Sequence, residues 1–322
     1  MKSIRIGIVG TGDISSRLVD AASRTDRVEI AAVCSRKVDT GRAFAEKHGI
    51  ERVYSSYPDM LSDVNLDALY VASPIFMHKE HSLKAISAGK HVLCEKAIAV
   101  NYAEFSEMKR AAIDKGRVLL EAMRPRFDGS VELLRENLHL VGNIRRASFV
   151  FCKYSSRYDD FKRGIVRNAF DPGIKNSALT DIGIYPLSIC ISLFGLPSIV
   201  SSQSVFLSNG FEGAGEARLI YPDFSAQIKY SKIENGEPCS VIEGERGSLL
   251  VYSVNAPQRI VFKSGGEEHD LPFSPKENNM EDELAAFRDM VLGERSWLSA
   301  LEDTDKTMQV IDSIYASSGI AF

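Results

Sequence analysis

The chain has 322 residues, 44% of them hydrophobic and 25% charged, with a formal net charge of −4. This length favours two domains, and the mild acidity with scattered basic residues argues against a nucleic-acid partner. No apolar run reaches the roughly 20 residues that a membrane helix needs. The five cysteines include no C-x-x-C pair, and the N-terminus runs straight into a strand. We therefore expect free thiols, no targeting segment, no metal site and a cytoplasmic protein.

The first 124 residues alternate between apolar strand-like runs and helical patterns. Strands are expected at 4–10, 28–34, 66–72, 91–94 and 117–122, and helices at 14–23, 37–48, 79–88 and 102–115. Such alternation, with nearly continuously apolar strands, is typical of a parallel sheet covered on both faces. We predict an α/β fold whose residues 1–124 form a doubly wound, dinucleotide-binding Rossmann domain.

After Pro125 the pattern changes to α+β. Helices are expected at 127–138, 181–194, 280–292 and 302–316, and strands at 144–154, 216–222, 225–231, 239–244, 248–254 and 258–263. Residues 155–177 show no clear period. We predict a second domain over 125–322 with an open, largely antiparallel sheet that binds the substrate. Because an open sheet face needs cover, we expect a homodimer or homotetramer packed through it.

The stretch "GIVGTGDIS" joins the first strand to the first helix. Gly10 allows a tight turn, Gly12 lets a pyrophosphate approach the backbone, and the helix N-terminus offers N–H groups. We expect the cofactor at Gly10, Thr11, Gly12, Asp13 and Ile14. The alternative is a glycine turn kept for steric reasons alone.

The end of the second strand distinguishes NADP from NAD. It reads "CSRK", with Ser35, Arg36 and Lys37, and no carboxylate comes before Asp39. A hydroxyl and two cations suit a 2′-phosphate, whereas a carboxylate would suit the ribose diol of NAD. NADP is therefore favoured, with NAD as the other candidate, and a solvated helix start is the alternative interpretation.

"HVLCEKAIAV" places Glu95 and Lys96 directly after an apolar strand. In a doubly wound sheet this is the carboxyl edge, where the ligand binds. The preceding strand ends at the same edge with "ASPIFMH", which supplies Ser73, Pro74 and His78. We expect all of these residues to contact the cofactor.

At this point the sequence resembles the Gfo/Idh/MocA family of NAD(P)-dependent oxidoreductases. The matching pieces are "GIVGTGDIS", "AVCSRK", "VASPIFMHKEHSLKAISAGKHVLCEKA", "EAMRPRF", "FDPGIKNSALTDIGIYPL", "IEGERGSLLV" and "AFRDMVLGE". The resemblance implies a Rossmann domain, an α/β domain with an open sheet, and a catalytic lysine at Lys96. "DIGIY" is most similar to the dimeric dihydrodiol dehydrogenase branch, which implies an acid/base tyrosine at Tyr185. Ala97 stands where the family has proline, and Lys175-Asn176-Ser177 where it has glycines.

The spacing of Asp181 and Tyr185 fits this chemistry. Four residues apart, they project from one helix face, and Pro186 requires that this helix has just begun. Reducing a carbonyl needs a hydride and a proton, and an ammonium beside a phenol stabilises the tyrosinate. We expect Tyr185 as proton donor/acceptor and Lys96 as its electrostatic partner, or the reverse, beside one nicotinamide ring. Asp181 would orient a partner. In the alternative, the tyrosine is a core residue and Asp181 a helix cap.

We therefore predict an NADP(H)-dependent oxidoreductase acting on the hydroxyl or carbonyl carbon of a diol, sugar or polyol. Arg124 and Arg167 are expected to contact this small-molecule substrate. The first alternative is a cofactor-binding regulator without turnover, although such a protein need keep neither Lys96 nor Tyr185. A redox-assisted glycosidase is a second alternative, which no additional carboxylate group in the sequence supports.

Overall fold

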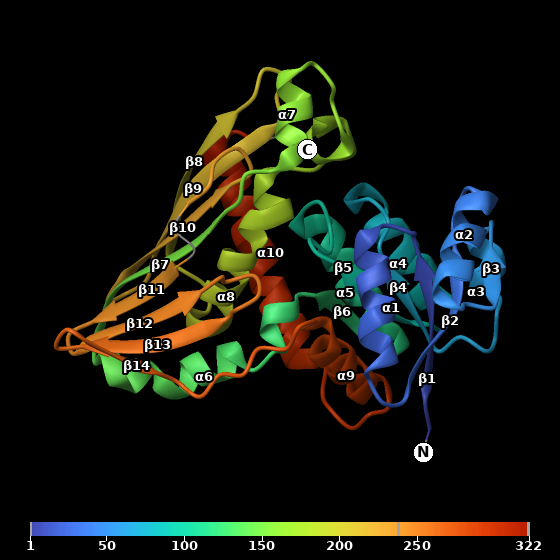
Figure 1. The fold of residues 1–322 in the computed structure, drawn as a ribbon, viewed down its shortest axis with the longest axis horizontal. Helices are drawn as coiled ribbons and strands as arrows, with labels where there is room; N and C mark the ends of the chain where they lie inside the picture. The colour runs from blue at the N-terminus through green and yellow to red at the C-terminus, as the bar shows by residue number, and fades with distance from the viewer. Residues whose placement is uncertain (1, 237–238, 321–322) are drawn as a thin grey trace. The chain divides into compact units, whose positions relative to one another are not determined.

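Figure 1 shows the computed structural model, which describes residues 2–236 and 239–320. The outermost ends of the two predicted domains, residue 1 and residues 321–322, lie outside the described part. The chain forms two compact units. The first contains the residues up to Ala99, Ala103–Ala122 and Asn278–Glu302, and the second contains Val100–Tyr102, Met123–Glu277 and the residues from Asp303 on.

The segment Asn278–Glu302 belongs to the first unit, whereas the sequence analysis assigns it to the domain 125–322. The reason is a set of polar contacts with the first helix of the chain. Asn278 Nδ2 donates to the Arg17 carbonyl oxygen at 2.9 Å, and Arg24 Nε lies 2.9 Å from Glu281 Oε1. These contacts join residues more than 250 positions apart, so no local pattern indicates them.

The first unit is built on a parallel sheet. Its strands are β1 Ile4–Val9, β2 Val28–Cys34, β3 Arg52–Tyr54, β4 Ala68–Val71, β5 His91–Glu95 and β6 Leu119–Ala122. Its helices are α1 Asp13–Ser23, α2 Val38–His48, α3 Tyr57–Leu61, α4 His78–Ser87, α5 Tyr102–Lys115 and α9 Met280–Val291, with a 3₁₀ turn at Ile75–Met77. β3 and α3 are absent from the sequence prediction because three and five residues are too few to establish a period.

The strand order is β3-β2-β1-β4-β5-β6, and every pair is parallel. The order reverses between β1 and β4, which is the topological switch point at which doubly wound sheets bind ligands. β1 and β4 are almost wholly buried, in keeping with their continuously apolar sequences. The predicted Rossmann fold is confirmed.

The second unit is built on an eight-stranded sheet. Its strands are β7 Ile144–Cys152, β8 Ile199–Phe206, β9 Glu212–Ile220, β10 Ser225–Ser231, β11 Cys239–Gly244, β12 Gly247–Tyr252, β13 Arg259–Ser264 and β14 Glu267–Asp270. Its helices are α6 Ser130–Asn137, α7 Ser156–Lys162, α8 Ile184–Phe194 and most of α10 Leu298–Ser318. Short 3₁₀ turns cover Arg124–Arg126, Leu138–Val141, Asn168–Phe170 and Pro172–Ile174, and a π turn covers Leu179–Gly183.

This sheet has the order β14-β13-β12-β11-β7-β10-β9-β8. β7 and β10 pair in parallel and the other neighbours are antiparallel, so the predicted open and largely antiparallel sheet is confirmed. The strands expected at 216–222 and 225–231 pair as a hairpin, with Ser225 opposite Ile220. α8 packs on β7 and β10 (Figure 1), and the Gly183 position leaves room for the Tyr230 ring, since a Cβ at Gly183 would lie 2.7 Å from it.

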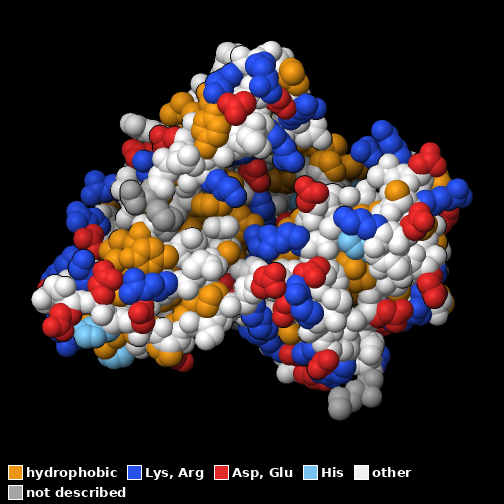
Figure 2. All heavy atoms as spheres, viewed as in Figure 1, with side chains coloured by type: hydrophobic (Ala, Val, Ile, Leu, Met, Phe, Trp, Pro, Cys, Tyr) orange, Lys and Arg blue, Asp and Glu red, His pale blue; other side chains and the backbone are white. Residues whose placement is uncertain are grey.

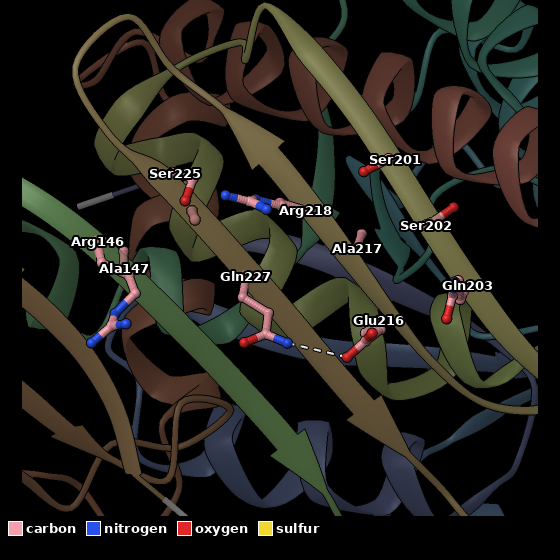
Figure 3. A pocket seen from close by; sticks show the side chains of 11 residues that line it. Arg146, Ala147, Ser201, Ser202, Gln203, Glu216, Ala217, Arg218, Ser225 and Gln227 are labelled. Atoms are coloured by element: carbon pink, nitrogen blue, oxygen red, sulfur yellow. Dashed lines mark hydrogen bonds between the residues drawn. The ribbon is translucent and has the colours of Figure 1, made fainter.

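The face of the sheet turned away from α8 carries polar side chains. A hollow of about 460 Å³ lies there across β7, β10, β9 and β8 (Figure 3). Gln227 Nε2 donates to Glu216 Oε2 across the pair β10–β9 at 3.1 Å. None of the residues that line this hollow is among the predicted catalytic residues.

Charged side chains of both signs are interspersed on the face of the molecule shown in Figure 2. None of the described helices is both long and apolar enough to cross a bilayer. The cysteines are free, as predicted, and burial raises the pKa of the Cys34 thiol to about 11 and that of Cys190 to about 12. Among the described residues, no group of three His, Cys, Asp or Glu side chains could hold a metal ion.

Candidate functional site

The glycine turn between β1 and α1 has the geometry of a phosphate-binding turn. Gly10 has a φ of +111°, and a Cβ there would lie 2.6 Å from the Ala72 carbonyl oxygen, so only glycine fits. At Gly12, the N-cap of α1, a Cβ would meet no protein atom within 4 Å. Space therefore remains open beside the Gly12 backbone at the start of a helix, where an anion is stabilised. Thr11 and Ile14 are half-buried and Asp13 is exposed at the same turn.

The cations predicted to bind the 2′-phosphate lie at the end of β2. Ser35 is half-buried, and Arg36 and Lys37 are exposed. Within the described part of the chain, neither cation forms an ion pair, so their charges are not neutralised locally. Arg36 is also close enough to His81 to contribute, after burial and Lys84, to lowering the pKa of that imidazole. These groups fit the adenosine end of a dinucleotide that carries an additional phosphate.

The loop after β4 is fixed by two histidines. His81 Nδ1 lies 2.9 Å from Ser73 Oγ, and His78 Nε2 lies 2.7 Å from the Ser73 carbonyl oxygen. The other ring nitrogen of His78 lies 2.9 Å from the Ala97 carbonyl oxygen, and burial lowers the pKa of His78 to about 4. A neutral ring has one N–H and donates to one of these oxygens at a time.

His78 therefore links the loop that holds Ser73 and Pro74 to the residue that follows Lys96. Only 2% of its surface is exposed, and both ring nitrogens face backbone carbonyls. The described contacts of His78 are therefore positioning contacts, and its expected contact with the cofactor stays a prediction. Ser73 and Pro74 themselves are half-buried at the sheet edge.

Glu95 and Lys96 lie where the sequence predicts, at the carboxyl end of β5. Glu95 is the last residue of the strand and accepts a hydrogen bond from the Tyr70 hydroxyl. Lys96 is half-buried, and its peptide bond to Ala97 is cis. The Ile98 N–H donates to Glu121 Oε1 at 3.1 Å, so the segment after Lys96 is held by this carboxylate as well as by His78.

In the second unit, Tyr185 is the second residue of α8, which agrees with the inference from Pro186 that the helix has just begun. Only 6% of Tyr185 is exposed. Its hydroxyl oxygen accepts a hydrogen bond from Arg124 Nη2 at 3.1 Å, and the Phe151 ring packs edge-on at 5.8 Å between centroids. This charge-assisted hydrogen bond and the ring contact fix the position of the phenol. The described contact of Arg124 is with this phenol, and its expected contact with the substrate stays a prediction.

Asp181 lies in the π turn that precedes α8 and is paired with a residue that the sequence analysis overlooked. Lys232 Nζ lies 2.7 Å from Asp181 Oδ2, and the lysine side chain is only 4% exposed. The alternation of side chains along a strand could have identified Lys232 from the sequence. Ile228 and Tyr230 are buried, and Lys232 lies two residues further on, so it is expected on the same buried face. Glu212, also overlooked, accepts a hydrogen bond from the Leu179 N–H at 2.9 Å and thereby fixes the start of the turn.

Arg167 takes part in a different set of contacts. Its Nε is 2.9 Å from Asp160 Oδ2, on a carboxylate that Arg163 also contacts, and its side chain is 58% exposed. The described contacts of Arg167 are therefore those of a surface ion pair, and its predicted contact with substrate stays a prediction. The same holds for the predicted meeting of Lys96 and Tyr185 at one nicotinamide ring.

Comparisons with known proteins agree with this geometry. The family model of the Gfo/Idh/MocA oxidoreductases, an oxidoreductase family with an NAD-binding Rossmann fold, matches residues 4–123. A scyllo-inositol 2-dehydrogenase (NADP(+)) from Bacillus subtilis (strain 168) is 35% identical over 96% of this chain and 98% of its own length. A trans-1,2-dihydrobenzene-1,2-diol dehydrogenase from Mus musculus is 29% identical over 86% of this chain and 83% of its own.

Solved structures share the fold. A 3-ketoreductase from Actinomadura kijaniata in complex with NADP and TDP-benzene matches with a TM-score of 0.88 and 22% identity, over 98% of both chains. An aldose-aldose oxidoreductase from Caulobacter crescentus complexed with glycerol matches with a TM-score of 0.87 and 20% identity, over 99% of this chain and 98% of its own. The NADP named for two of these proteins agrees with the cofactor prediction. The chain belongs to the Gfo/Idh/MocA family of NAD(P)-dependent oxidoreductases.

Proposed function

We propose that this protein is an NADP(H)-dependent oxidoreductase that acts on the hydroxyl or carbonyl carbon of a polyol, sugar or diol. The names of the relatives support this substrate class, since they include a scyllo-inositol dehydrogenase and a dihydrodiol dehydrogenase. The observation that carries the proposal is the hydrogen bond from a buried guanidinium, that of Arg124, to the hydroxyl of Tyr185.

The first unit would hold the cofactor. Gly10 and Gly12 would receive the pyrophosphate, Ser35, Arg36 and Lys37 the 2′-phosphate, and Glu95 and Ser73 the nicotinamide end. When bound, NADP accepts or supplies the hydride. The open space beside Gly12 and the unneutralised cations after β2 support these assignments.

Tyr185 would move the proton. In the direction of oxidation, its phenolate accepts the proton of the substrate hydroxyl while the hydride leaves the same carbon; in reduction, the phenol returns the proton to the forming alkoxide. The guanidinium of Arg124 holds the Tyr185 oxygen in place in both directions. Lys96 is the second candidate for this acid–base role, and we propose that it supplies an ammonium to the substrate oxygen.

The test is steady-state kinetics with NADP and a panel of scyllo-inositol, trans-1,2-diols and aldoses. Tyr185→Phe is expected to lower kcat by about 100-fold or more, in line with the loss of a general acid–base, and to leave the NADPH dissociation constant unchanged. Tyr252→Phe is the matched control, because Tyr252 also lies near a guanidinium, with Arg259 Cζ 5.7 Å from its ring centroid. Full turnover by Tyr185→Phe would contradict the assignment. NADPH binding by the wild-type protein without turnover of any substrate would favour the regulatory alternative.

We also propose a cytoplasmic homodimer or homotetramer assembled through the polar face of the eight-stranded sheet. That face carries the hollow of Figure 3 and exposes apolar side chains on β8, with Ile199 60% and Val205 53% exposed. Burial of such side chains favours association. Sedimentation at micromolar concentration is expected to give twice or four times the chain mass, and a monomer would refute the assembly.

A further inference from the structure

The π turn before α8 places Asp181 against an ammonium that is shielded from water. Lys232 Nζ lies 2.7 Å from Asp181 Oδ2, and the two side chains are 4% and 35% exposed respectively. We propose that Lys232 is a positioning residue that holds Asp181 ready to accept a hydrogen bond from a second hydroxyl of the substrate. This inference rests on the proposed function, because it assigns that hydroxyl to the carbon next to the one on which Tyr185 acts.

The backbone of Lys232 is fixed on both sides. Its N–H donates to the Gly213 carbonyl oxygen at 2.9 Å, and its own carbonyl oxygen accepts from the Ser155 N–H at 2.9 Å. Lys232 also directly follows β10, the central strand on which the π turn packs. The position from which the lysine side chain starts is therefore set by the sheet rather than by a loop.

The ammonium itself lies in a polar and aromatic pocket. Nζ donates to the Ala169 carbonyl oxygen at 2.5 Å and lies 4.8 Å and 5.0 Å from the ring centroids of Phe170 and Phe211. Both distances are within the range in which an aromatic face attracts a cation. Because these groups exclude water, the attraction between Lys232 and Asp181 is screened far less than that of a surface pair.

The geometry of the helix start then selects a type of substrate. Asp181 lies in the π turn that leads directly into α8, and Tyr185 is the second residue of that helix. Because the carboxylate and the phenol come from one continuous stretch of chain, they are assigned to two oxygens on adjacent carbons. An ionised carboxylate only accepts hydrogen bonds, which suits a hydroxyl and not a second anion. The arrangement therefore favours polyols with adjacent hydroxyls over simple alcohols.

The experiment compares Lys232→Met with Lys229→Met in the full-length protein, with NADP and scyllo-inositol as probes. Lys229 is the control because it lies on β10, three residues before Lys232, and its pair with Glu234, at 3.6 Å, is about half exposed. Lys232→Met is expected to raise KM for scyllo-inositol by about 10-fold or more, with a smaller change in kcat and an unchanged NADPH dissociation constant. Lys229→Met is expected to behave as wild type.

A double-mutant cycle shows whether Lys232 positions Asp181 or has a purely structural role. If Lys232 acts through Asp181, Asp181→Asn with Lys232→Met loses no more of kcat/KM than Asp181→Asn alone. The proposal would be overturned if the loss of kcat/KM in the double variant equalled the product of the two single losses. It would also be overturned if Lys232→Met lowered the melting temperature but left KM unchanged. Should Lys232→Met not fold, Phe211→Leu removes one ring beside the ammonium, and an unchanged KM in that variant would overturn it equally.

The proposed function is tested separately by the wild-type protein. Absence of wild-type turnover on every polyol would overturn the proposed function and this role together. Wild-type turnover combined with an unaffected Lys232→Met variant would overturn only the role of Lys232.

Discussion

Two alanine substitutions in the glycine turn are expected to separate folding from cofactor binding. At Gly10, an alanine would combine a φ of +111° with a Cβ 2.6 Å from a backbone oxygen. The unfavourable backbone costs about 1–3 kcal/mol and the overpacking about as much again. The total is about 2–6 kcal/mol, so at about 2–4 °C per kcal/mol the melting temperature of the first unit should fall by roughly 4–24 °C.

At Gly12 the expectation is the opposite. The backbone has a φ of −77° that alanine adopts easily, and its Cβ would meet no protein atom within 4 Å. Alanine is a less favourable N-cap than glycine, which lowers the free energy of unfolding by about 0.5–1 kcal/mol. It also makes the unfolded chain less flexible, which raises that free energy by about 0.4–1 kcal/mol, so the two effects roughly cancel. The added methyl group would instead occupy the space in which a pyrophosphate approaches the backbone, so NADPH should bind about 10-fold more weakly or worse.

The assay is thermal unfolding of both variants with and without NADP, together with a fluorescence titration of NADPH. Each variant is the control for the other, since they lie two residues apart in one turn. Wild-type affinity for NADPH in Gly12→Ala would refute the placement of the pyrophosphate. Wild-type stability in Gly10→Ala would refute the steric argument.

Three further substitutions test other parts of the molecule. Arg36→Ala should weaken NADPH binding about 10-fold or more and NADH binding hardly at all, because a charge-assisted phosphate contact contributes about 1.5–3 kcal/mol; equal losses in a paired titration would contradict this role. His91→Gln should flatten the fall in stability between pH 6.5 and about 4, measured by urea unfolding. The Val118 N–H donates to His91 Nδ1, and burial and Arg117 lower the pKa of His91 to about 4, so the unfolded chain binds its proton first and stability declines as the pH falls. The difference between a pKa of 6.5 in the unfolded chain and about 4 in the folded protein limits the contribution of His91 to the free energy of unfolding to about 3.5 kcal/mol. An unchanged dependence of stability on pH in the variant would exclude His91 as the cause of this decline. Gly183→Ala should cost about 1–3 kcal/mol, because its Cβ would lie 2.7 Å from the Tyr230 ring; an unchanged melting temperature would show that the ring can move aside.

Sequence patterns were sufficient wherever one short segment carries the physical signal. The strand at 28–34 and the helix at 102–115 have the predicted limits, since an apolar run and a 3.6-residue period need only neighbouring residues. The glycine turn is equally local. So is the position of Tyr185 at the start of a helix, which follows from the proline after it.

The tertiary structure decided which charged groups pair with one another. Arg124 meets Tyr185 across 61 positions, and Lys232, at the end of β10, meets Asp181 in the π turn. The ring nitrogens of His78 lie beside the backbone carbonyls of Ser73 and Ala97, which are far from each other in the sequence. Asn278–Glu302 returns to the first unit for a similar reason. The sequence by itself determined the family, the two folds and the residue types at the sheet edge, because those follow from periodicity and local backbone geometry. The partners of each charge depend on which strands become neighbours, and that is set by the packing of the whole chain.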